Sequence, residues 1–580
     1  MPHRVHLFSL RLGYALREVL AEGYQRAHLI RDIVAGVTVG VIAIPLAMGL
    51  AIASGVAPQY GLYTAIIAGA VIALTGGSRF SISGPTAAFV VILYPLTAKY
   101  GLSGLLLASM MAGVILVVMA WARLGRFIEY IPESVTLGFT GGIAIVIAVL
   151  QIPDFTGMTI GHLPEHFVGK VSVIGANLAG IDAGSCLLAL LTLVAMITWP
   201  RLRLPVPPHL PALALVSVVG ILLAAQGIEV DTIGSRFHYL QTDGTQAAGI
   251  PPYLPAFDWP WNHPGADGEP LTLSLELVSE LLPSAFAIAM LGAIESLLCA
   301  VVLDGMSGKR HSANSELLAQ GVGNLVTPLF GGITATAAIA RSATNFKTGA
   351  VSPIAGVVHA LVVLLGLLLF ASALAYVPMP AMAALLMVVA WNMSEAHKAR
   401  KLVQKSPRGD VLVFLTCLSL TVLLDMVIAI TAGVVLASLL FMKEIASLTQ
   451  VVDVTENRVL VREGLPGKWK VFKVRGPLFF AAADRIFSEI FHRAQGLDGL
   501  IIHMEYSSYL DAGGLSAVDR LLAQCADKQI SIRFSCWQFQ PLKTLAKARS
   551  AGVGPLEVSF STLEGAIDAV LSKGTNHEVG

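Results

Sequence analysis

Apolar runs long enough to cross a lipid bilayer recur between Ile33 and Met442, and this repetition restricts the fold more than any single motif does. The chain is 55% hydrophobic and only 13% charged, which separates it from soluble globular proteins. Inside hydrocarbon the backbone must satisfy its own hydrogen bonds, so these runs predict helices. We therefore expect a polytopic α-helical membrane protein.

The apolar runs can be counted as fourteen transmembrane segments, some of them too short to cross a bilayer alone. They are expected at residues 33–53, 60–75, 85–97, 103–121, 134–150, 183–199 and 210–226, and at 274–303, 316–328, 336–347, 352–376, 378–393, 409–424 and 427–442. Two sets of seven form an inverted repeat, because an odd number of spans reverses the second copy. This arrangement places the third and tenth elements opposite each other near the midplane.

The third and tenth elements look like half-helices with a common small-residue core, SGPTAAF at 83–89 and TATAAIAR at 334–341. Each follows a pair of glycines, at 76–77 and 331–332. Backbone N–H groups at a helix start lack partners within the helix and can hold an anion. Paired interrupted segments in two halves of a chain indicate the substrate site of a repeat-built transporter. The sequence therefore predicts a carrier of a small anion.

Two charged residues fall inside the apolar runs. Glu295 lies in the middle of its span, where an ionised group costs about 3 kcal/mol or more unless it faces a cavity or a partner. This cost indicates a function, although a helix-end carboxylate or a structural pair is the alternative. Arg341, near the start of the second half-helix, would attract an anion, and its alternative is a structural ion pair with Glu295.

Two threonines stand where the half-helices are expected to begin. Thr86 and Thr336 are interpreted first as N-caps, because threonine is common at that position. Their hydroxyl groups can also coordinate a ligand, and the two roles are compatible.

Lysine and arginine residues set the expected orientation in the membrane. They collect before the first span and after the twelfth, at Arg4, Arg11, Arg17, Arg26 and Arg31, and at Lys398, Arg400, Lys401, Lys405 and Arg408. The stretch 228–272 holds only Arg236 among many acidic residues and should face outward. An even number of spans then leaves both termini in the cytoplasm.

The C-terminal part alternates β-rich and helical stretches, which predicts a small α/β domain. Strands are expected at 469–474, 500–504 and 530–534, and helices at 484–493 and 514–525. Asp511 precedes the second helix and is expected to cap it. We divide the chain into a cytoplasmic N-terminal segment (1–32), a transmembrane transport domain (33–445) and this cytoplasmic domain (446–580).

Several function classes are disfavoured by the sequence. A net charge of +1 without dense basic tracts argues against nucleic-acid binding, and the five scattered cysteines have no metal-ligand spacing. The soluble part has no nucleotide-binding loop, which argues against an ATP-driven pump. The intramembrane His359 has no visible catalytic partner, so neither an enzyme nor a cofactor is expected.

The chain resembles the SulP family of anion transporters that carry a C-terminal STAS domain, and the likeness covers essentially its whole length. Four segments match family signatures, namely 57–63, 77–85, 315–321 and 331–336. Across 42–84 and 131–140 the chain is most similar to the members that carry C4-dicarboxylates.

This resemblance implies core and gate domains, an elevator-type movement and homodimers. The ligand site of the family corresponds here to Ala43, Leu46, Thr86, Ala87, Ala338, Ile339, Ala340 and Arg341, with Glu295 as the ion-coupling carboxylate. Some members have serine where this chain has Ala340, so anion contact there would rest on backbone N–H groups. Phospho-switched STAS domains have serine after the motif aspartate, whereas Ala512 follows Asp511, which favours a scaffolding or partner-binding role.

The resulting hypothesis is proton-coupled uptake of C4-dicarboxylates such as succinate, fumarate and aspartate across a bacterial inner membrane. The dicarboxylate identity rests on the resemblance, because the residues alone predict only an anion. The alternatives are a sulfate or bicarbonate permease, with sodium as the alternative coupling ion in place of protons, and a passive anion channel.

Overall fold

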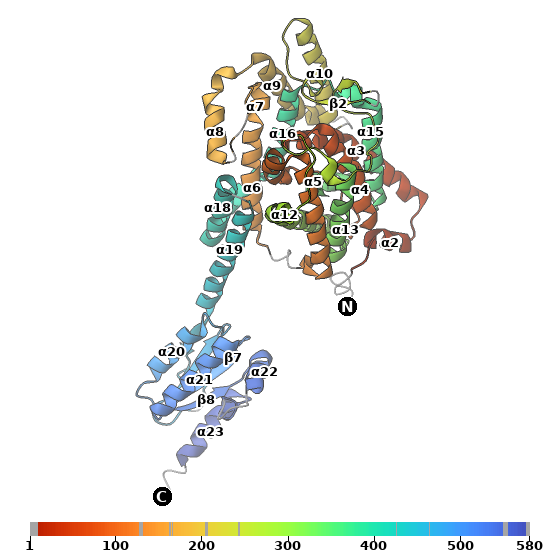
Figure 1. The fold of residues 1–580 in the computed structure, drawn as a ribbon. Coiled ribbons are helices and arrows are strands. Elements are labelled where there is room, and N and C mark those ends of the chain that lie inside the picture. Colours follow the sequence, from red (N-terminus) through yellow and green to blue (C-terminus); the bar gives the residue numbers. More distant parts are fainter. Residues whose placement is uncertain are drawn as a thin grey trace. The chain divides into compact units, whose positions relative to one another are not determined.

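The structure is a computed structural model of the chain and describes residues 10–126, 131–161, 164, 166–202, 207–241, 244–424, 426–462, 464–548 and 555–575. Arg4 therefore lies outside the described residues. The chain forms two compact units, 1–434 and 435–580, each of which is described by itself. The first unit is helical and the second combines a sheet with helices (Figure 1).

Each of the fourteen predicted spans coincides with a helical segment, so the predicted fold class is confirmed. The first seven are α3 (Arg26–Ala53), α4 (Pro58–Thr75), the two parts of α5 (Val90–Trp121), α6 (Glu133–Leu150), α9 (Ala183–Thr198) and α10 (His209–Ala225). The second seven are α12 (Leu275–Ser307), α13 (Ala313–Val326), α14 (Ile339–Thr348), α15 (Ile354–Leu374), α16 (Met379–Met393), α18 (Arg408–Leu423) and α19 (Met426–Leu448).

Helix α5 contains two predicted spans separated at a glycine. Gly101 has φ 68° and ψ −167°, which breaks the helix between the third and fourth elements. A Cβ atom at this position would lie 2.3 Å from the carbonyl carbon of Gly265, so only glycine fits this break. The third element is thus a half-helix, as the sequence predicted.

Among the described residues, four further α-helices of five or more residues in the membrane unit were not predicted. They are α2 (Tyr14–Ala21), α7 (Ile152–Thr156), α8 (Phe167–Ala176) and α17 (Ala396–Lys405). A short helix α11 (Ile233–Arg236) and a hairpin of β2 (His238–Leu240) and β3 (Gln246–Ala248) lie in the stretch expected to face outward.

A buried carboxylate joins the first span to the eleventh. Asp32 accepts hydrogen bonds from the backbone N–H groups of Val351 (2.7 Å) and Ser352 (3.1 Å), from the Ser352 hydroxyl and from the Tyr24 hydroxyl (2.7 Å). Four donors around one fully buried carboxylate satisfy its hydrogen-bonding capacity. Asp32 therefore caps the backbone immediately before α15, and its carboxylate has the partners it needs.

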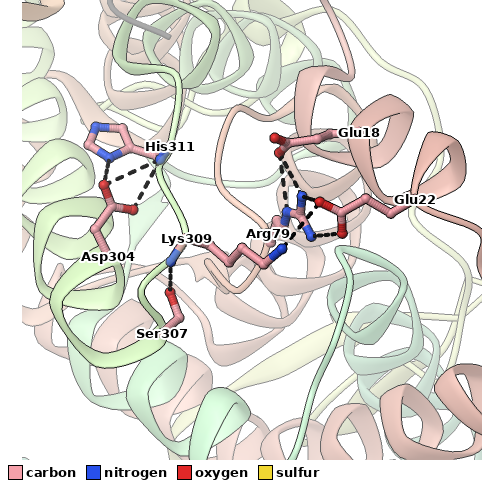
Figure 2. A network of polar contacts seen from close by, with 7 residues as sticks. All are labelled: Glu18, Glu22, Arg79, Asp304, Ser307, Lys309 and His311. Carbon is pink, nitrogen blue, oxygen red and sulfur yellow. Dashed lines mark hydrogen bonds and ion pairs between the residues drawn. The ribbon is translucent and has the colours of Figure 1, made fainter. Parts of the chain in front are cut away.

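The helix α2 is fastened to the membrane unit by an ionic network (Figure 2). The buried Arg79 guanidinium contacts Glu18 at 2.9 Å and Glu22 at 2.6 Å, and Lys309 contacts Glu22 at 3.2 Å. Hydrogen bonding from Arg79 lowers the pKa of the Glu22 carboxyl to about 2, against the effect of partial burial and helped by Lys309. Residues from three distant segments thereby hold the turn after α4.

Replacing Glu22 by glutamine is expected to destabilise the protein at neutral pH by about 0.5 kcal/mol, because the ion pair is partly exposed. A lowered carboxyl pKa contributes stability above the unfolded pKa of about 4.5, and this contribution is lost as the pH falls through about 2. The thermal midpoints of wild type and Glu22→Gln in detergent should therefore converge as the pH falls from 4.5 towards 2. Glu444→Gln serves as the control, and a gap that stays constant over this range would contradict the prediction.

The C-terminal unit contains a five-stranded sheet in the order β5-β6-β7-β8-β9, in which β5 (Gln450–Asp453) is antiparallel and the other neighbours are parallel. The remaining strands are β6 (Trp469–Arg475), β7 (Gly499–Tyr506), β8 (Ser531–Ser535) and β9 (Ser559–Phe560), and the helices are α20 (Ala483–Ala494), α21 (Ala512–Asp527), α22 (Phe539–Ala548) and α23 (Leu563–Thr575). The three strands and two helices predicted from the sequence are confirmed. Hydrophobic cores cover both faces of the sheet.

The predicted cap at Asp511 is also confirmed. One carboxylate oxygen accepts from the backbone N–H of Gly514 at 2.7 Å, and the other accepts from that of Phe480 at 3.1 Å. Asp511 thus joins the start of α21 to the loop before α20.

Asp511→Ala should destabilise the start of α21 by about 1 kcal/mol, since an N-cap of this type typically contributes that much. Hydrogen exchange of residues 513–516 in the full-length protein should accelerate about fivefold. Asp519→Ala, a change at an exposed position of the same helix, should leave exchange unchanged. Equal exchange in Asp511→Ala and wild type would show that the cap contributes nothing.

Candidate functional site

The candidate site is built around two very short strands that precede the half-helices. β1 (Ser83–Gly84) pairs antiparallel with β4 (Thr336–Ala337), with Gly84 opposite Thr336 and Ser83 opposite Ala337. The backbone N–H of Ala338 also donates to the Ile82 carbonyl at 3.0 Å. Extended backbone at membrane depth needs partners, and each segment supplies them to the other. The pairing brings the two half-helix starts together, as the inverted repeat predicted.

Side chains complete the backbone hydrogen bonds around β4. The Asn324 amide both donates to the Ala335 carbonyl and accepts from its N–H, each at 2.8 Å, so it acts like a strand neighbour. The Thr64 hydroxyl donates to the Ile333 carbonyl at 3.2 Å. Sequence reasoning did not identify these two residues, because polar side chains in apolar helices carry no local sign of their partners.

The turn before β1 is held by a residue of the 315–321 segment. The buried Glu316 carboxylate accepts from the backbone N–H groups of Gly77 (2.9 Å) and Ser78 (3.0 Å), and from the Gln320 amide (3.0 Å). A Cβ atom on Gly77 would lie 2.3 Å from the Ser312 carbonyl oxygen, so this approach requires glycine. The glycine pair and Glu316 together set the position of β1.

The two half-helices begin at different points from those expected. The first starts with a 3-10 turn, η1 (Ala87–Phe89), which leads into α5, and the second is α14. Thr86 precedes η1 but caps no backbone group, and Thr336 lies in β4 three residues before α14. The predicted capping roles are therefore wrong, because both hydroxyl groups bond elsewhere.

Helix α12 supplies the partners of both threonines. The Thr86 hydroxyl donates to the Glu295 carboxylate at 2.9 Å. The Thr336 hydroxyl bonds the Ser296 hydroxyl at 2.6 Å and the Gly292 carbonyl at 3.0 Å. Glu295 is half-buried at mid-helix, so the alternative of a helix-end carboxylate does not apply. One turn of α12 thus contacts both half-helix entries.

Arg341 is buried and points towards β1. Its Nη2 atom donates to the Pro85 carbonyl at 2.6 Å, whereas Nη1 has no hydrogen-bond partner among the described residues. A Cβ atom on Gly84 would lie 2.8 Å from Nη1, so glycine makes room for the guanidinium. Arg341 and Glu295, both described, form no direct ion pair, although their charges interact electrostatically at a longer distance. A buried guanidinium with a free donor needs a further partner.

The other residues assigned to the site belong to three elements, α14, η1 and α3. Ala338, Ile339 and Ala340 form the start of α14, where Ile339 is 38% exposed and Ala340 is also exposed. Ala87 is buried in η1. Ala43 and Leu46 lie on α3, which packs against α14. The exposed start of α14 leaves its first backbone N–H groups accessible.

This arrangement can bind an anion without a metal or cofactor. Two helix starts present N–H groups and positive dipole ends, and Arg341 adds a full positive charge. The half-buried Glu295 carboxyl, bonded to Thr86, is adjacent to one of these helix starts. Proton or cation binding at Glu295 would therefore act on the charge balance of the anion site.

Comparisons with known proteins identify a family for each of the two units. The model of the Sulfate permease family matches residues 29–417, and that of the STAS domain matches residues 459–565. The Bacillus subtilis (strain 168) protein YvdB, whose name refers to sulfate transport, is 38% identical over 91% of this chain and 95% of its own length. The bicarbonate transporter BicA of Picosynechococcus is 28% identical over 86% of this chain and 87% of its own.

Solved structures agree in fold. Murine Solute Carrier 26 family member A9, an anion transporter solved in an inward-facing state, superposes with a TM-score of 0.82 over 97% of this chain and 94% of its own, at 16% identity. The transmembrane domain of a cyanobacterial BicA superposes with a TM-score of 0.59 over 72% of this chain and 98% of its own, at 26% identity.

Proposed function

This chain belongs to the sulfate permease family of anion transporters, and we propose that it is a secondary active carrier that takes up C4-dicarboxylates together with protons. The substrates would be succinate, fumarate and aspartate. One observation carries the anion site: two half-helix starts are joined by the β1–β4 pair beside the buried Arg341, whose Nη1 atom bonds none of the described residues. The anion would accept from the N–H groups at Ala87 and Ile339–Arg341, because the Ala338 N–H is bonded to the Ile82 carbonyl.

Proton coupling is assigned to Glu295. Its carboxylate bonds Thr86 and is half-buried, so it can exchange protons with solvent while it is adjacent to the anion site. Protonation would remove one negative charge beside an incoming anion and favour its binding. Movement of a core built from α3, α4, α5, α12, α13, α14 and α15, which pack on one another, would then carry both across the membrane against the remaining helices in an elevator-type cycle.

A sulfate or bicarbonate permease is the second candidate. The relatives with the reported identities are named for sulfate and bicarbonate, and both anions suit two helix starts. In that case sodium, instead of a proton, is the alternative coupling ion at Glu295. A passive anion channel would differ from both by giving current without saturable exchange.

The proposed setting is a bacterial inner membrane with both termini in the cytoplasm and the carrier as a homodimer. The basic residues before α3 and in α17 support this orientation. Ala512 follows the capping Asp511, so we assign the STAS domain a scaffolding or protein-binding role in place of a phosphorylation switch at that position.

Uptake into proteoliposomes tests the proposal. Labelled succinate should accumulate when the outside is acidic, should not respond to a sodium gradient, and should be displaced by excess fumarate. Displacement by sulfate or bicarbonate but not by fumarate would replace the first candidate with the second. Electrical current without counterflow of unlabelled anion would reject a carrier altogether.

A further inference from the structure

His359 on α15 is a buried histidine that the proposed cycle does not use. The residue is fully buried, and neither Nδ1 nor Nε2 has a hydrogen-bond partner within the described part of the chain. The ring interacts with the backbone of Gly356, one turn earlier, without hydrogen-bond geometry. Buried polar groups are nearly always paired, so an unpaired imidazole needs an explanation.

The imidazole lies beside β1, and Arg341 of α14 contacts the same segment. A Cβ atom on Gly69 of α4 would lie 3.3 Å from the His359 Nδ1 atom and 3.5 Å from the Ser83 carbonyl oxygen. Arg341 contacts the next two residues of the same segment, Gly84 and Pro85. The two unsatisfied groups therefore flank three consecutive residues at the entry to the first half-helix, and the charge of Arg341 acts on the ring.

Other ionisable groups lie on the elements around Arg341 and His359. Helix α3 offers Asp32, which is occupied by four donors near the start of α15, and α4 offers only Tyr60 and Tyr63 in its first two turns. On α12, Glu295 bonds Thr86 and also interacts electrostatically with Arg341. Arg341 in turn acts on the His359 ring, so a change in the charge balance around Arg341 also affects the ring.

We propose that His359 is a second proton-binding group of the transport core, whose protonation is linked to anion binding through Arg341. Two positive charges on either side of residues 83–85 in a low-dielectric interior repel each other, so the imidazole is neutral while the site is empty. An anion bound beside Arg341 offsets the guanidinium charge and allows a proton from solvent to bind the ring. The linkage is reciprocal, so lower pH strengthens anion binding. This inference rests on the proposed anion site.

Calorimetric titration of the purified full-length protein tests it. Sulfate and succinate, both dianions at pH 7.5, are titrated in buffers of different ionisation enthalpy, which gives the number of protons taken up per anion bound. His359→Gln should bind anion yet take up fewer protons than wild type, by as much as about one per anion. The anion affinity of wild type should rise as the pH falls, and the variant should lose up to about tenfold of this rise per pH unit. Glu295→Gln should keep the share that belongs to His359.

His209→Gln is the matched control, since His209 is another membrane histidine with an unsatisfied Nδ1 at the start of α10. It should take up protons as wild type does. Equal proton uptake in His359→Gln and wild type would overturn the inference and leave the anion site intact. Absence of any proton uptake by the wild type would overturn it without reference to the folding of a variant. Failure of the wild type to bind either anion would reject the proposed function itself.

Discussion

Arg341→Gln is expected to reduce anion uptake by about a thousandfold. A unit charge about 4 Å from an anion contributes about 4 kcal/mol at an effective dielectric constant of about 20, and the variant loses this attraction. Glutamine cannot supply the free Nη1 donor that the guanidinium presents beside the half-helix starts. The measurement is initial uptake of labelled anion into proteoliposomes at equal amounts of folded protein.

Two variants separate the charge of Arg341 from its geometry. Arg341→Lys keeps the positive charge, so it should recover part of the uptake. Recovery should be incomplete, because lysine lacks the planar guanidinium whose Nη2 atom bonds the Pro85 carbonyl. Lys347→Gln removes one positive charge from the last turn of the same helix α14 and should remain within about threefold of wild type. If Arg341→Gln also stays within that range, the guanidinium does not bind the substrate.

Glu295→Gln is expected to abolish accumulation driven by a pH gradient while exchange of internal for external anion continues. The amide can still bond Thr86 but cannot ionise, so the geometry persists without the proton. For one proton per anion, a gradient of one pH unit supports about tenfold accumulation in wild type and none in the variant. Uptake under imposed pH and sodium gradients, together with counterflow, measures both quantities.

Glu276→Gln changes an exposed carboxylate in the first turn of the same helix and provides the matched control. It should accumulate anion as wild type does. Full pH-driven accumulation by Glu295→Gln would show that this carboxylate does not carry the coupling proton. If wild type responds to sodium instead of pH and the variant does not, Glu295 couples sodium transport.

Much of the fold could be predicted from the sequence because its signals are local. Apolar runs of spanning length correspond to helices, since hydrocarbon leaves the backbone no other way to satisfy its hydrogen bonds. The capping Asp511 and the alternation of strands and helices in the C-terminal unit also depend on neighbouring residues.

The contacts of the candidate site could only partly be predicted. The two half-helices, and the choice of Glu295 and Arg341 as candidate site residues, followed from small-residue segments and from charges in apolar runs. The capping roles of Thr86 and Thr336 were wrong, since their hydroxyl groups bond α12 instead. The roles of Asn324 and Glu316 were missed, because each bonds backbone that is unremarkable in sequence.

The sequence by itself determined where the chain crosses the membrane, where it is interrupted, and that its soluble part alternates strands and helices. Only the tertiary structure decided that Gly84 pairs with Thr336, that Arg341 points to β1 with one donor free, and that His359 lies beside the same strand. The physical reason is range. Helix formation depends on groups a few residues apart, whereas these contacts join segments far apart in the chain, whose partners are chosen by packing and by the need to satisfy buried polar groups.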